Sequence, residues 1–143
     1  MPLNHNIMKK EQLILTREDF IFLTECYFSD HISPFNKEKL SHDLRNVKIM
    51  RSEYLPSNVV RTNSSVLVTC IDKSQTFNIH IVSLDSMTKK SNQIPISDPL
   101  AVALLGYRTG SIVEWEMLDG IHQFQIVSVH QADVDSVLNS IIA

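Results

Sequence analysis

The stretch from Asp98 to Ser111 constrains the fold of this chain more than any other. It reads Asp-Pro-Leu-Ala-Val-Ala-Leu-Leu-Gly-Tyr-Arg-Thr-Gly-Ser. An aspartate followed by a proline is typical of a helix cap and first turn, and Gly106 can adopt the left-handed conformation that ends a helix. The residues between them are all apolar, so the helix has no face for solvent. The sequence therefore predicts one short, buried helix over residues 98–105.

The residues after this helix predict a β-hairpin. Val113, Trp115 and Met117 alternate with more polar neighbours over residues 112–117, which is the period of a strand with one buried face. The Asp119-Gly120 pair that follows is a strong signal for a tight turn. Residues 122–130 then return as the second strand. Trp115 is expected to lie in the core.

Two more strands are expected before the helix, over residues 65–71 and 77–84, joined by a short polar loop. Residues 94–97 are few and contain Pro95, which favours an edge segment over a central strand. The predicted fold class is therefore α+β, with four or five mostly antiparallel strands wrapped on a single helix.

The N-terminal part of the chain predicts a pair of helices. Thr16 can cap a helix that runs to about residue 32, and Pro34 suits the first turn of a second one. Each carries one apolar stripe, so the two should pair as a short antiparallel hairpin. We divide the chain into a flexible leader, a helical hairpin, a globular domain and an amphipathic tail helix, at residues 1–13, 14–50, 51–132 and 133–143.

The tail helix is expected to bury one apolar face. Its apolar residues are spaced for a single stripe. They are Val134, Val137, Leu138, Ile141 and Ile142. The stripe can pack on the chain's own sheet or hairpin, or it can form a homodimer contact.

Composition excludes several classes of function. The net charge of −3 argues against a nucleic-acid binder that needs a basic face, so a protein partner is favoured. Cys26 and Cys70 stand 44 positions apart, and the six histidines show no ligand spacing, so we expect buried thiols and neither a metal site nor a cofactor. No apolar run approaches the roughly 20 residues of a membrane span. We expect a cytoplasmic protein that binds no membrane.

Several motifs resemble one bacterial family. Pro-Leu-Ala-x-Ala-Leu-Leu-Gly from Pro99, then Gly110, a strand and a glycine-containing hairpin are similar to the C-terminal domain of the Gre-type transcript cleavage factors. They are also similar to the shorter Rnk proteins, the regulators of nucleoside diphosphate kinase. Ser52-x-x-Leu-Pro and Val59-Val60-x-x-Asn63-Ser64 extend the likeness, which covers residues 40–131 well. The resemblance implies an FKBP-like domain preceded by a helical hairpin.

The resemblance also implies a partner, RNA polymerase. In Gre-type factors the turn before the short helix presses on a coiled coil at the rim of the polymerase secondary channel. The matching positions here are Ser97, Asp98, Pro99 and Leu100. Asp98 and Pro99 can also serve only as a helix cap, and the two roles are compatible.

The tip of the hairpin decides what the resemblance implies about activity. Gre-type factors carry an acidic pair, Asp-x-x-Glu, at the tip of a long finger, where it helps to hold a catalytic Mg²⁺. Here Asp30 stands alone, because Ser33 occupies the second acidic position. A helix over residues 17–32 would span only about 24 Å.

The short finger and single acid favour a Rnk-like, non-enzymatic regulator that binds RNA polymerase without cleaving RNA. One alternative is a transcript cleavage factor that uses Asp30. Another, from a different class, is a prolyl isomerase-like or small-ligand-binding domain, since an FKBP-like fold does not by itself specify a function.

Overall fold

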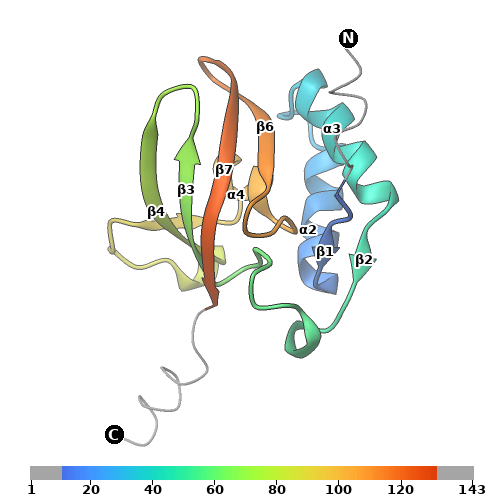
Figure 1. Cartoon of the computed structure of the whole chain (residues 1–143). Helices are drawn as coiled ribbons and strands as arrows, with labels where there is room; N and C mark the ends of the chain where they lie inside the picture. Colours follow the sequence, from blue (N-terminus) through green and yellow to red (C-terminus); the bar gives the residue numbers. More distant parts are fainter. Residues whose placement is uncertain (1–10, 132–143) are drawn as a thin grey trace, which may run out of the picture.

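The computed structural model describes residues 11–131, so the expected tail helix and its dimer contact lie outside the described residues. Five strands form one curled sheet in the order β5-β4-β3-β7-β6 (Figure 1). β4 and β5 run parallel, and the other three pairings are antiparallel. The strands are β3 (Ser64–Cys70), β4 (Gln75–Val82), β5 (Gln93–Pro95), β6 (Ile112–Met117) and β7 (Gly120–Gln131). Together with the helices described below, this sheet confirms the predicted mixed helix and sheet fold.

Buried and more exposed side chains alternate along the strands, as expected for a sheet with one face toward the core. Every second residue of β3 is buried, which places Val66, Val68 and Cys70 on the core face. Trp115 in β6 is only 4% exposed, so its predicted place in the core is confirmed. β6 and β7 join at the Asp119-Gly120 turn, where Gly120 has a φ of 130° that favours glycine.

The buried helix α4 (Pro99–Leu104) forms as predicted. The carboxylate of Asp98 caps it, since Oδ1 accepts a hydrogen bond of 2.9 Å from the Leu100 amide. Gly106 follows with a φ of 88°, the left-handed conformation expected there. The sheet curls around this helix (Figure 1).

Two helices, α2 (Arg17–Phe28) and α3 (Pro34–Arg45), form the predicted hairpin beside β6 (Figure 1). Thr16 and Ser33 cap their first turns through side-chain oxygens. The expectation that the first helix reaches residue 32 was wrong. It ends at Phe28, because Ser29 is extended and its hydroxyl donates to the Cys26 carbonyl.

A two-residue parallel pairing that the sequence analysis missed closes the base of the hairpin. β1 (Ile14–Leu15) pairs with β2 (Lys48–Ile49). Leu13 is 1% exposed and Leu15 is fully buried. The predicted loose leader over residues 1–13 therefore differs from the structure at its end, because Leu13 packs in the core.

The helical hairpin and the sheet share one hydrophobic core. Leu15, Leu23 and Leu40 from the N-terminal part pack in the same cluster as Leu104 of α4 and Trp115 of β6. Among the described residues, no helix is long and apolar enough to cross a membrane.

Gly106 should be the glycine that tolerates substitution least. A Cβ at this position would lie 2.8 Å from Leu15 Cδ2, in addition to the strain of a positive φ. We expect Gly106→Ala to lower the free energy of unfolding by about 2–4 kcal/mol, measured by urea denaturation. Gly110→Ala is the matched control, because Gly110 has a φ of 92° and open space at its Cβ. It should cost only about 1–2 kcal/mol. Equal losses in the two variants would contradict the predicted clash.

Candidate functional site

The turn before α4 presents some, but not all, of the predicted docking residues to solvent. Ser97 and Pro99 are exposed, and Asp98 is half-buried. Leu100 is 8% exposed and belongs to the hydrophobic core, so it can support the turn but offers little contact surface. The Asp98 amide donates to the Pro95 carbonyl at 2.9 Å, which fixes the turn to the end of β5.

The hairpin tip lies between Phe28 and Ser33 and carries a single acid. Asp30 is exposed, and Phe28 beside it is 72% exposed, with its ring edge-on to that of Tyr27. The hairpin contacts β6, whereas the 97–100 turn follows β5 at the opposite edge of the sheet. The structure therefore places the predicted tip and the predicted docking turn on separate parts of the molecule.

Asn36 in the first turn of α3 joins the hairpin to the sheet. Its Nδ2 donates to the Glu116 carbonyl at 2.9 Å, and its Oδ1 accepts from the Glu116 amide at 2.8 Å. The Asn36 side chain thus bonds to edge strand β6 as a neighbouring strand would. Asn36 is 5% exposed, so both bonds are shielded from water. No local sequence pattern predicts this contact, because 80 positions separate the two residues.

A second polar contact joins the middle of α3 to the segment after α4. Tyr107 donates its hydroxyl to Asp43 Oδ2 at 2.6 Å, and Lys39 donates to the Tyr107 oxygen at 2.5 Å. The Lys39 ammonium also lies 4.6 Å from the centre of the Tyr107 ring. Burial, and then the nearby Asp43 charge, raise the pKa of Tyr107 well above its ordinary value, so the phenol stays protonated. The hairpin is therefore held on the domain along its length.

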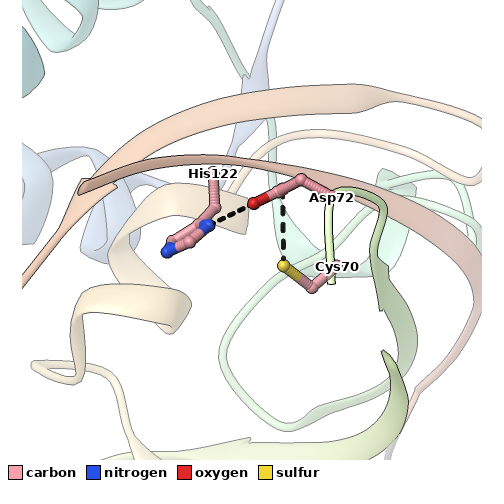
Figure 2. Close-up of side chains that lie close together, drawn as sticks. All are labelled: Cys70, Asp72 and His122. Atoms are coloured by element: carbon pink, nitrogen blue, oxygen red, sulfur yellow. Dashed lines mark hydrogen bonds and ion pairs between the residues drawn. The ribbon is translucent and has the colours of Figure 1, made fainter. Parts of the chain in front are cut away.

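A third polar cluster links the β3–β4 turn to the β6–β7 turn, centred on His122 (Figure 2). His122 Nδ1 lies 2.5 Å from Asp72 Oδ2, and His122 Nε2 lies 2.6 Å from Asp119 Oδ1. Lys73 completes an ion pair with Asp119 at 2.6 Å. Cys70, which is 3% exposed, donates to Asp72 Oδ1 at 3.6 Å.

The charges in this cluster shift its acid–base equilibria. The hydrogen bond from His122 lowers the pKa of Asp72 to about 2, and the bond from Lys73, followed by that from His122, lowers the pKa of Asp119 to about 2. The same bonds, that from Asp72 first, raise the pKa of His122. Burial raises the pKa of the Cys70 thiol. The imidazolium form of His122 is therefore favoured between two carboxylates.

The cluster was not predicted, because His122 has no second histidine at ligand spacing and its partner Asp72 lies on a distant turn. Pairing of β3 with β7 sets Cys70 opposite Phe124, which brings the two turns together across 50 positions. A searchable signal was present: Cys-x-Asp lies at the end of one predicted strand, and Asp-x-x-His runs from the other predicted turn into the strand that follows it.

Comparison with known proteins agrees with this architecture. A protein-family model described as "Transcription elongation factor, GreA/GreB, C-term" matches residues 55–131, which is more than half of the chain. The chain belongs to the GreA/GreB family. The matched region contains the five-stranded sheet, α4 and the turn before α4.

Individual GreA/GreB relatives are distant in sequence. The chain is 26% identical to the transcription elongation factor GreA of Clostridium novyi over 91 residues, which cover 64% of this chain and 57% of that protein. It is 27% identical to GreA of Acetivibrio thermocellus over 93 residues, which cover 65% and 58% of the two chains. The match thus spans less than two thirds of the length of these relatives.

A solved structure supports the fold over a wider range. The prokaryotic transcription elongation factor GreA/GreB from Nitrosomonas europaea superposes with a TM-score of 0.59 at 24% sequence identity. The superposition covers 85% of this chain and 99% of that one, so it extends beyond the part that the family model matches. At this level of identity the likeness concerns the fold alone.

The contact between Asn36 and β6 should contribute measurably to stability. Asn36→Ala leaves the Glu116 amide and carbonyl without their partners, so we expect the free energy of unfolding to fall by about 1–3 kcal/mol. The Glu116 amide should also exchange faster with solvent deuterium. Glu38→Ala, at an exposed position of the same helix, is the control for helix propensity. Unchanged exchange at Glu116 in Asn36→Ala would contradict the role given to this contact.

Proposed function

We propose that this GreA/GreB family member is a Rnk-like, non-enzymatic regulator that docks on RNA polymerase near its secondary channel. The FKBP-like domain makes the contact, and the hairpin partly occupies the entrance. The observation that carries the proposal is the size and chemistry of the hairpin: each helix has 12 residues, and the turn between them holds one carboxylate, Asp30.

The hairpin is poorly suited to deliver a metal ligand deep in a channel. Twelve helical residues span about 18 Å, which is less than a long Gre-type finger would need. Mg²⁺ takes hard oxygen ligands in nearly octahedral geometry, so a cleavage factor must supply correctly spaced carboxylate oxygens. The second acidic position is occupied by Ser33, and the intervening His31 and Ile32 offer no carboxylate either. This supports docking without cleavage.

The docking turn can make a contact while it caps α4. Asp98 uses Oδ1 for the cap, and within residues 11–131 its Oδ2 accepts no hydrogen bond. That oxygen can therefore meet a donor on a partner. Pro99 and Ser97 are exposed on either side, which provides a small rigid surface around one negative charge. Such a surface fits a polymerase segment with a basic side chain.

The proposal predicts binding to core RNA polymerase that depends on this turn. Asn is as good a helix cap as Asp, so Asp98→Asn removes the charge and preserves the fold. We expect the double variant Asp98→Asn, Pro99→Ala to bind polymerase at least tenfold more weakly than the wild type, measured by fluorescence anisotropy. Asp85→Asn, which also removes one exposed charge, is the control and should bind normally. Equal binding by all three proteins would exclude docking through this turn.

The proposal also predicts the outcome of a cleavage assay on backtracked elongation complexes. The wild-type protein should stimulate no RNA cleavage above background, because it lacks the acidic pair. Added in excess, it should inhibit the cleavage stimulated by a long-fingered GreA, and the docking variant should not inhibit. Cleavage that is stimulated by the wild type and lost in Asp30→Ala would instead establish a cleavage factor that uses Asp30.

A further inference from the structure

We propose that Cys70, Asp72 and His122 form a binding site for a divalent transition-metal ion of the zinc class. One ligand atom from each residue lies within 4.8 Å of the other two. The inference does not depend on the proposed function, because the residues lie at the two hairpin turns and the docking turn follows β5.

The donor set is the first argument for this class of ion. A thiolate, an imidazole and a carboxylate together suit Zn²⁺ or Co²⁺, whereas Mg²⁺ and Ca²⁺ prefer oxygen alone. Cys70 Sγ lies 3.6 Å from Asp72 Oδ1, and His122 Nδ1 lies 2.5 Å from Asp72 Oδ2. Bonds of about 2.0–2.3 Å in a tetrahedral site require ligand atoms roughly 3.3–3.8 Å apart. The Cys70–Asp72 separation already lies in that range, whereas His122 Nδ1 and Asp72 Oδ2 would have to move apart by roughly 1 Å to admit the ion.

The surroundings of His122 are the second argument. With Nδ1 on a metal ion, the other ring nitrogen carries a hydrogen, and Asp119 Oδ1 lies 2.6 Å from it, ready to accept. Asp119 is in turn held by Lys73. A carboxylate that orients the distal nitrogen of a ligating histidine is the usual support of a protein zinc site. Here that support is already assembled.

Access to the site is the third argument. Cys70 and His122 are buried, at 3% and 8% exposure, so the protein side of the site is closed. The Asp72 side chain is 45% exposed, which leaves a path to solvent. The Gln123 amide donates to Asp72 Oδ1 at 3.1 Å and holds this ligand in place. A water molecule can supply the fourth ligand, as in zinc sites with three protein ligands.

Cobalt binding to the full-length protein tests the proposal. Co²⁺ is titrated into metal-free protein while the near-ultraviolet thiolate-to-cobalt charge-transfer band and the visible ligand-field bands are recorded. We expect saturation at one ion per chain and displacement by Zn²⁺. The charge-transfer band should be lost in Cys70→Ser and kept in Cys26→Ser, the matched control for the second thiol of the chain.

A second variant keeps the test decisive if Cys70→Ser disturbs the core. Asp119→Asn alters an exposed residue that orients His122 but is not itself a ligand. It should weaken Co²⁺ binding about 10–100-fold without abolishing the thiolate band. Absence of a thiolate band in the wild type would overturn the proposal. The role of His122 would then be limited to its hydrogen bonds with Asp72 and Asp119, which join the two turns. Affinity that is unchanged in both Asp119→Asn and Cys70→Ser would also overturn it.

Discussion

The close contact between residues 13–15 and Gly106 is the constraint on which the rest of the structure depends. The Ile14 amide donates to the Gly106 carbonyl at 3.2 Å, and the Gly106 amide donates to the Val60 carbonyl at 2.9 Å. Three segments that are distant in the sequence therefore meet at one residue without a side chain. Leu13 and Leu15 fill the space where a Cβ would stand. The helical hairpin, the start of the sheet and the end of α4 are positioned together by this contact.

This arrangement makes the hairpin part of the domain instead of a separate finger. It shares the core through Leu23 and Leu40, and it bonds to the rest of the domain through Asn36 and Asp43. A partner that binds the turn before α4 would therefore meet the hairpin at a fixed distance and angle. Because the hairpin is already fixed on the domain, binding would cost little conformational entropy. A small contact surface can then give a higher affinity than it would on a flexible protein.

The features that were predicted correctly are those with local signals. The caps at Thr16 and Asp98 and the Asp119-Gly120 turn each depend on a few adjacent residues with definite backbone preferences. The β1–β2 pairing, the Asn36 contact and the His122 cluster depend on residues that are 34 to 80 positions apart. Such contacts follow from strand register and helix docking, which no single stretch of sequence encodes. The resemblance was confirmed at the level of the GreA/GreB family, whose model matches residues 55–131.

The total charge of the His122 cluster would be the same with the proposed ion as without it. With the Cys70 thiol protonated and His122 as imidazolium, the two positive charges of His122 and Lys73 balance the carboxylates of Asp72 and Asp119. Binding a divalent ion would release one proton from the thiol and one from the imidazolium, so the total charge would not change. The exchange therefore leaves no buried charge uncompensated. In either state the cluster would hold the β3–β4 turn and the β6–β7 turn together. It would do so without involving the surface around Asp98.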